Sequence, residues 1–192
     1  MTGKDGAPIL FFETADEWEK WLEKHHTYTK AVWLQFYKKA SGKKSLNYDQ
    51  ALDEALCYGW IDGVVNAYDA DSYLQRFTPR RPKSNWSKRN TEHIIRLTKL
   101  GKMKPAGTLQ VSLAKKDGRW QAAYASPANI QIPKDFLEEI AKNKKAKAFF
   151  DSLNRTNFYA IAYRLATAKK PETLKRRKKL IVSMLEKEKT FH

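Results

Sequence analysis

The stretch from Ala55 to Asn90 constrains the fold more than any other part of this sequence. Gly59 is well placed to end a helix, because glycine adopts the left-handed conformation that helix ends favour. Two strand-like segments rich in aromatic and β-branched residues follow at 60–68 and 72–77. Only a short Asp-Ala-Asp turn separates these segments, so we predict an antiparallel hairpin.

A basic turn and a helix follow this hairpin. Residues 78–83 contain two prolines, which remove backbone donors and fix the backbone, so we predict irregular structure there. Ser84 or Ser87 is then placed to cap a helix. That helix is expected to reach Leu100 and to stop at Gly101.

The order of the remaining segments predicts the fold class. Residues 8–13 and 31–38 have the composition of strands. Thr14 with Glu17, and Asn47 with Gln50, have the spacing of capping boxes that begin two helices. Because strands cluster early and helices late, we predict an α+β fold. Its N-terminal two-thirds would hold a small antiparallel or mixed sheet with packed helices, followed by a helical C-terminal region.

The same pattern gives a domain boundary. We predict an α+β domain at residues 1–125 and a helical region at 126–192 packed on it. Residues 126–133 are expected to form an extended connection. Pro171 suits the first turn of the last helix, because its missing N–H has no partner to lose there.

Composition favours a globular protein of the cytoplasm. Of the 192 residues 42% are apolar, which is enough for a core, and no apolar run of 18 or more residues predicts a membrane span. No secretory signal is visible at the N-terminus. Cys57 is the single cysteine, so no internal disulfide can form, as is usual in a reducing compartment.

The net charge of +16 is concentrated in two blocks. Residues 76–104 carry a net charge of +9 and residues 142–192 carry +11, whereas residues 1–75 carry −4. Such blocks concentrate anions near a protein surface, although runs of charge are often only solvated faces.

The sequence lacks the motifs of common enzymes, including GxSxG, GxGxxG, the Walker loop, HExxH and CxxC. Four scattered histidines and one cysteine do not suggest a metal site or a cofactor. Cys57 is expected to be a small buried residue, with a nucleophilic role as the less favoured alternative. We therefore lean towards a non-enzymatic protein.

The first basic block predicts an anion-binding site. Ser84, Ser87 and Asn90 are spaced by three, so they would share one stripe of the predicted helix. The start of a helix offers free N–H groups and partial positive charge, and arginines add bidentate hydrogen bonds. The predicted ligand-binding residues are Arg76, Arg80, Arg81, Ser84, Trp86, Ser87 and Asn90, with Trp60, Asp62 and Trp120 as walls. An ordinary capped helix, tryptophans in the core and an ion-paired Asp62 are the alternatives.

The second basic block predicts a contact with nucleic acid or an anionic membrane. Lys175, Arg176, Arg177, Lys178 and Lys179 are consecutive, so on a helix they point to all sides. A solvated helix face is the alternative.

Five blocks of this sequence resemble those of the YdeI/OmpD-associated family, also called bacteriocin-protection proteins. They read LDEALCYGWIDGV, RFTPRRPKSNWSKRN, GKMKPAG, DGRW and AKKPETLKRR, and the resemblance extends from Phe11 to about Leu185. It implies a small α+β protein and a role in protection against bacteriocins or antimicrobial peptides. It implies no catalytic residues.

These observations lead to three functional hypotheses. The first is a bacterial stress or antimicrobial-resistance factor that binds a small anionic ligand without catalysis. The second is a nucleic-acid-binding module that uses both basic blocks, and the third is an enzyme of unknown reaction around Trp60, Asp62 and Arg80. A protein partner is a further alternative. The salt dependence of binding separates the first two, because many phosphate contacts give a steep slope.

Overall fold

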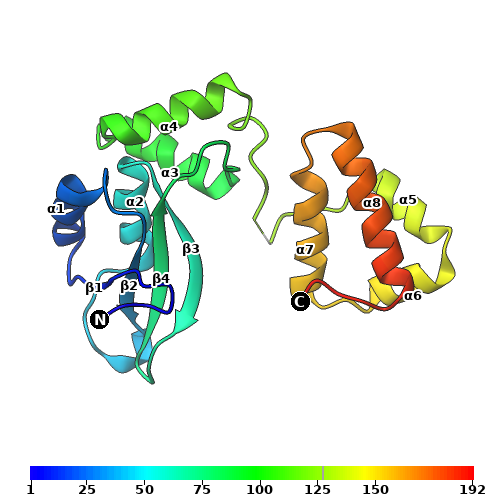
Figure 1. Ribbon diagram of the computed structural model, residues 1–192, viewed down its shortest axis with the longest axis horizontal. Helices are drawn as coiled ribbons and strands as arrows, with labels where there is room; N and C mark the ends of the chain where they lie inside the picture. Colours follow the sequence, from blue (N-terminus) through cyan, green and yellow to red (C-terminus); the bar gives the residue numbers. More distant parts are fainter. Residues whose placement is uncertain (127) are drawn as a thin grey trace. The chain divides into compact units, whose positions relative to one another are not determined.

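The computed structural model describes residues 1–126 and 128–192, and within them it divides into two compact units. The N-terminal unit consists of residues 1–84 and 90–121, and the C-terminal unit consists of residues 85–89 and 122–192. The described residues form eight α-helices and one four-stranded mixed sheet, which confirms the α+β class (Figure 1). The predicted boundary between residues 125 and 126 stays a prediction.

The sheet of the N-terminal unit has the order β1-β2-β4-β3. β1 runs parallel to β2, since α1 connects them by a crossover, and the other neighbours are antiparallel. The predicted hairpin is confirmed as β3 and β4, with a bulge between Asp62 and Val65. The strands are β1 (Ile9–Phe11), β2 (Val32–Tyr37), β3 (Trp60–Ala67) and β4 (Ser72–Pro79).

Both predicted capping boxes are confirmed. The Thr14 hydroxyl accepts from the Glu17 N–H at 3.3 Å, and the Asn47 side chain accepts from the Gln50 N–H at 2.9 Å. The helices of the N-terminal unit are α1 (Ala15–His25), α2 (Tyr48–Cys57), the 3₁₀ turn η1 (Lys39–Ser41), α3 (Lys88–Lys99), which enters this unit at Asn90, and α4 (Pro105–Lys116).

Aromatic side chains join α1 and α2 to the sheet. Trp18 of α1 is fully buried, with its ring centroid 6.3 Å from that of Trp60 and 5.9 Å from that of Phe77. Its indole N–H donates to the carbonyl of Ala51 in α2 at 3.1 Å, and the indole of Trp60 donates to the carbonyl of His26 at 3.2 Å. The indole N–H groups of Trp18 and Trp60 therefore both have acceptors, as buried polar groups require.

Strand β4 extends further than the sequence predicts. Residues 78–83 were expected to be irregular, yet Thr78 and Pro79 pair with Ile61 and Trp60 of β3. The N–H of Arg80 points towards β3 and donates to the carbonyl of Gly59 at 2.9 Å. Successive residues of a strand direct their nitrogens to opposite edges, so the nitrogen of Pro79 points away from β3, towards the β2 side. The pairing of β2 with β4 has already ended at Val32 and Phe77, and the missing donor therefore costs no sheet hydrogen bond.

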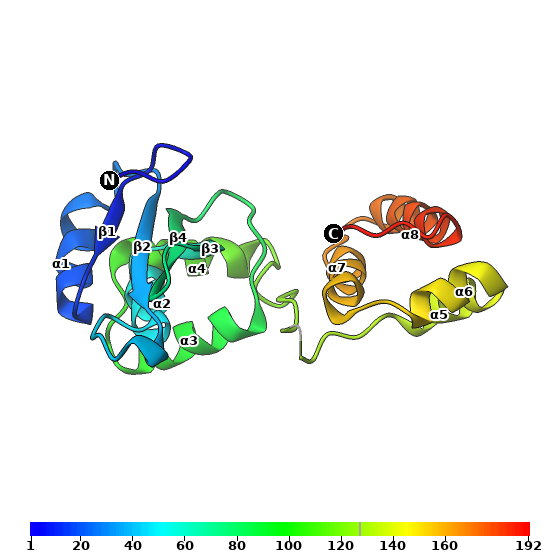
Figure 2. The same cartoon turned by 90° about the horizontal axis from the view of Figure 1, so that it is seen from below.

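The C-terminal unit is helical, as predicted. Its buried core includes Phe136, Ile140, Ile161, Ile181 and Leu185. Residues 85–89 join this unit through backbone hydrogen bonds to Tyr124. Pro127, which belongs to the predicted connection 126–133, lies outside the described residues. Its helices are α5 (Lys134–Ala141), α6 (Lys144–Asp151), α7 (Arg155–Ala166) and α8 (Pro171–Glu186) (Figure 2).

Among residues 1–126 and 128–192, no helix combines the length and the apolar composition needed to cross a bilayer.

The packing of α4 on α2 predicts a sensitive glycine. A Cβ at Gly107 would lie 2.7 Å from the carbonyl oxygen of Leu56 and even nearer to that of Cys57, where backbone cannot give way easily. We expect Gly107→Ala to lower the free energy of unfolding by about 1–3 kcal/mol, as overpacking does. Denaturant unfolding measures this loss. Gly63→Ala is the control, because its Cβ would meet nothing closer than 3.6 Å, and equal losses in both variants would contradict the argument.

Candidate functional site

The ten predicted ligand-binding residues are divided between the two units. Trp86 and Ser87 belong to the C-terminal unit. The other eight belong to the N-terminal unit, namely Trp60, Asp62, Arg76, Arg80, Arg81, Ser84, Asn90 and Trp120.

The predicted polar stripe of Ser84, Ser87 and Asn90 is wrong. Helix α3 begins at Lys88, so only Asn90 lies on it. Ser84 follows a turn in which Lys83 has a φ of 62°, and Ser87 forms an isolated bridge with Tyr124. Because both serines precede the helix, their spacing by three does not place them on one helical face.

Buried arginines hold the turn that follows β4. Arg80 is only 6% exposed, and its Nη1 lies 3.5 Å from the Ser84 hydroxyl. Arg119 is equally buried, donates to the carbonyl of Ser84 at 3.0 Å and pairs with Asp117 at 2.7 Å. Arg81 points to solvent. Of these three arginines, Arg81 is therefore the one whose side chain a soluble ligand reaches directly.

Of the three predicted walls, Trp60 lies in the interior, whereas Asp62 and Trp120 are half-buried. Trp60 and Trp86 are each 1% exposed, which matches the alternative of core packing. Asp62 accepts a hydrogen bond from the Tyr48 hydroxyl at 2.8 Å. Trp120 is half-buried, and the Lys115 ammonium lies 5.3 Å from the centre of its ring.

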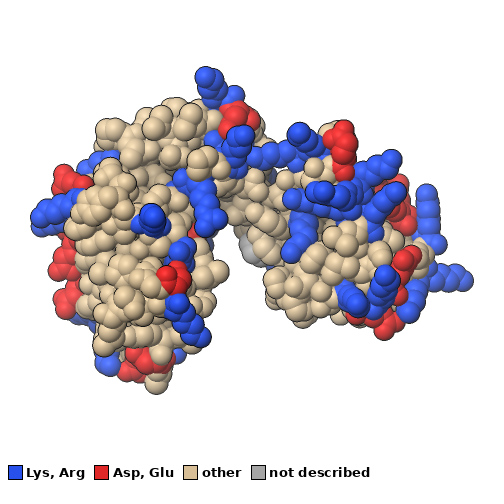
Figure 3. All heavy atoms as spheres, in the orientation of Figure 1, with Lys and Arg blue, Asp and Glu red and all other residues tan. Residues whose placement is uncertain are grey.

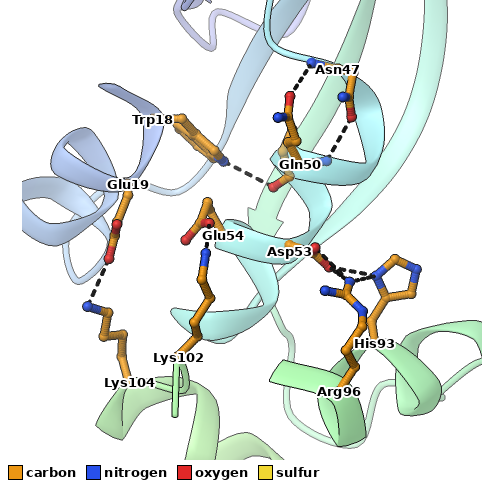
Figure 4. Close-up of polar contacts among 11 residues, drawn as sticks. Trp18, Glu19, Asn47, Gln50, Asp53, Glu54, His93, Arg96, Lys102 and Lys104 are labelled. Atoms are coloured by element: carbon orange, nitrogen blue, oxygen red, sulfur yellow. Dashed lines mark hydrogen bonds and ion pairs between the residues drawn. The ribbon is translucent and has the colours of Figure 1, made fainter. Parts of the chain in front are cut away.

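Four of the ten Lys and Arg residues at 76–104 pair with carboxylates of the first 75 residues. Arg96 and His93 of α3 both contact Asp53 of α2 at 2.6 Å (Figure 4). Lys102 pairs with Glu54 at 3.4 Å and Lys104 with Glu19 at 2.8 Å (Figure 4). Arg76 pairs with Asp5 at 2.8 Å. Part of a block that looks like an anion-binding surface in sequence therefore serves internal charge compensation.

Burial controls the protonation of two groups on α2. Desolvation raises the pKa of Glu54, and the attraction of Lys102 offsets this only in part. Desolvation, with the nearby Glu54 carboxylate, raises the pKa of Cys57 to about 12. The reactive form of cysteine is the thiolate, so this environment disfavours a nucleophilic role.

A cavity of about 830 Å³ lies beside the start of α2, and the sequence analysis did not identify it. Its lining combines aromatic rings, four lysines and the first turn of α2. The lining residues are Glu13, Phe36, Tyr37, Lys38, Lys39, Lys43, Lys44, Ser45, Leu46, Asn47, Tyr48, Asp49, Gln50, Asp53 and Tyr73. The signal in the sequence was the pair of Lys-Lys dipeptides that flank Ala40-Ser41-Gly42 after an aromatic strand.

The four lysines of this cavity have two different roles. The Lys38 ammonium donates to the carbonyl of Ala70 at 2.9 Å, and Lys43 pairs with Asp71 at 2.8 Å. These two contacts attach the cavity loop to the β3–β4 turn. Lys39 and Lys44 are exposed, and neither makes an ion pair with any residue that the structure describes. Their charges are therefore available to a ligand.

The second predicted basic block, residues 175–179, also contains both residues with internal contacts and residues that are exposed. Arg177 donates to the carbonyl of Arg164 at 2.5 Å and to the Thr167 hydroxyl at 3.1 Å. Lys178 pairs with Asp135 at 2.5 Å. The other three members, Lys175, Arg176 and Lys179, are exposed on α8.

Within the described ranges, no group of three or more His, Cys, Asp or Glu side chains is arranged to hold a metal ion.

The pairing of Arg76 with Asp5 predicts a pH-dependent contribution to stability. Hydrogen bonds from the indole of Trp33 and from Arg76 lower the pKa of Asp5 from 3.8 to about 2. A carboxyl group with a lowered folded-state pKa stabilises the fold above its unfolded pKa. That stabilisation is lost as the pH falls through the folded pKa.

We therefore expect Asp5→Asn to be less stable than the parent protein at pH 7, with a difference that shrinks between pH 4 and 2. Unfolding measured across this range tests the expectation. A difference that stays constant with pH would show that the carboxylate charge of Asp5 contributes nothing.

Comparison with known families complements this geometry. Residues 10–110, more than half of the chain, match a family model described as Domain of unknown function (DUF8412). Residues 129–188 match one described as Bacteriocin-protection, YdeI or OmpD-Associated, which confirms the predicted resemblance in the C-terminal unit. No curated protein and no solved structure matches the chain. The chain therefore belongs to the DUF8412 family through residues 10–110 and carries a YdeI or OmpD-associated domain at residues 129–188.

Proposed function

We propose that this protein binds a small anionic ligand, without catalysing a reaction, in the cavity beside the start of α2. The observation that carries the proposal is that Lys39 and Lys44, which line a cavity of about 830 Å³, are exposed and make no ion pair with the described part of the chain. A volume of this size lies within the range of about 300–1,000 Å³ that is typical of small-molecule sites.

The other groups of the cavity suggest how such a ligand would be held. Tyr37, Tyr48 and Tyr73 line the cavity with aromatic surface that an uncharged portion of the ligand would contact. The first turn of α2 adds the partial positive charge of a helix N-terminus. Glu13 and Asp49 also line the cavity and disfavour an anion near them. The anionic group therefore belongs at the Lys39 and Lys44 side, and a phosphate or carboxylate on a nucleotide-sized body fits this arrangement.

The family description suggests a setting for this binding. The C-terminal unit matches a family described as bacteriocin-protection. We accordingly place the protein in a bacterial stress or antimicrobial-resistance response in the cytoplasm, where phosphorylated metabolites are plentiful.

A thermal-shift experiment tests the cavity. The probes are inorganic phosphate, adenosine monophosphate and glucose 6-phosphate, each added to the full chain. A ligand present at 100 times its Kd stabilises the folded state by about 2.7 kcal/mol. For a protein of this size that raises the unfolding midpoint by roughly 5–10 °C. We expect at least one phosphorylated probe to give such a shift, and the double variant Lys39→Gln/Lys44→Gln to lose it.

Two further variants make the result decisive. Lys20→Gln/Lys24→Gln removes the same charge from exposed positions of α1 and should keep the shift. Arg81→Gln tests the arginine turn that the sequence predicts as the ligand site. If Arg81→Gln abolishes the shift and the Lys39/Lys44 variant does not, the cavity is not the site. The absence of a shift with every probe would overturn the proposal of a phosphorylated ligand.

A further inference from the structure

A basic face on α8 makes no ion pair with the residues that the structure describes. Lys175, Arg176 and Lys179 are exposed, whereas Arg177 and Lys178 make the contacts described above. With 3.6 residues per turn, the three exposed side chains fall within one arc of about 100°. Buried Ile181 and Leu185 lie on the opposite side of the helix. Figure 3 shows Lys and Arg side chains gathered over this unit.

The preceding residues extend this face. Lys169 and Lys170 are exposed immediately before α8, and neither has an ion-pair partner among the described residues. Glu172 is exposed in the first turn and offsets one charge. These additions leave a surplus of positive charge along the N-terminal half of the helix.

The cations on and before α8 repel one another and the start of the helix. Lys175 and Lys179 are one turn apart, where like charges repel. Lys169 and Lys170 lie directly before the helix, where its N-terminus carries partial positive charge. An anionic partner would compensate both effects.

The structure favours a double-stranded nucleic acid over a membrane as that partner. Interfacial helices insert an apolar face into the lipid, but the apolar face of α8 is packed in the core of its own unit. As far as the structure describes the C-terminal unit, its most exposed large apolar side chains are Leu137 at 36% and Leu180 at 54%, and neither is aromatic. Single strands are held by stacking on exposed aromatic rings, so this surface suits a phosphate backbone instead.

We propose that Lys175, Arg176 and Lys179, supported by Lys169 and Lys170, bind the phosphate backbone of double-stranded nucleic acid without reading its sequence. This surface lies in a different unit from the cavity of the proposed function. Either proposal can therefore fail without the other.

Fluorescence anisotropy with the full chain tests this surface. The probes are labelled 20-base-pair DNA and RNA duplexes, the corresponding single strands, and phosphatidylglycerol vesicles measured by co-sedimentation, between 50 and 200 mM NaCl. We expect a duplex to bind regardless of its sequence, with affinity that falls steeply with salt. Each phosphate contact adds about 0.9 to the slope of log affinity against log salt for B-form DNA. The triple variant Lys175→Gln/Arg176→Gln/Lys179→Gln should thus lower that slope by about 2.7.

A charge-matched control separates this face from the effect of net charge. Lys20→Gln/Lys24→Gln/Lys30→Gln removes the same charge from exposed positions of the N-terminal unit and should keep the parental slope. The triple variant on α8 should unfold at the same temperature as the parent protein or higher, because it relieves the repulsion between Lys175 and Lys179. Three results would overturn the proposal: equal losses in both triple variants, binding to vesicles but not to duplexes, or tighter binding to single strands than to duplexes. A comparison of the two duplexes identifies DNA or RNA as the partner.

Discussion

The burial of Trp18 between the sheet and α2 is the interaction on which the N-terminal unit depends. This side chain has no exposed surface and contacts the rings of Phe12, Trp60 and Phe77. Its indole N–H is satisfied by the backbone of α2, so the large apolar surface is buried without the loss of a hydrogen bond. This contact fixes α2 on the sheet, and the first turn of α2 in turn forms one side of the cavity.

Charge compensation connects α2 to the segment that follows the sheet. Asp53 and Glu54 of α2 lie beside cations from residues 93–102. Burial raises the pKa of Glu54, because the attraction of Lys102 is weaker than the effect of removing the carboxylate from water. Such pairs specify where the chain packs more than they stabilise it. Cations used in this way are not available to a ligand, which is why the excess charge of residues 76–104 overstates the anion-binding surface.

Several features were predictable from the sequence because they depend on local chemistry. The capping boxes at Thr14 and Asn47 involve residues three apart, so their side chains reach the helix start whatever surrounds them. The β3–β4 hairpin was predictable for the same reason, since a short polar turn joins two apolar segments. The extension of β4 through Pro79 was not predictable. Whether a proline removes a sheet hydrogen bond depends on which neighbouring strand its nitrogen faces, and the sequence does not show this.

The sequence by itself determined the α+β class, the capped helices, the hairpin and the family resemblance. Only the tertiary structure decided which charged residues are used internally and which are exposed. Lys175 and Lys178 are equivalent in the sequence, yet Lys178 pairs with Asp135 from a distant helix and Lys175 faces solvent. The cavity likewise joins residues from β2, the following loop and α2, with Tyr73 from β4. Both outcomes depend on contacts between residues far apart in the chain, which local patterns of charge and hydrophobicity do not encode.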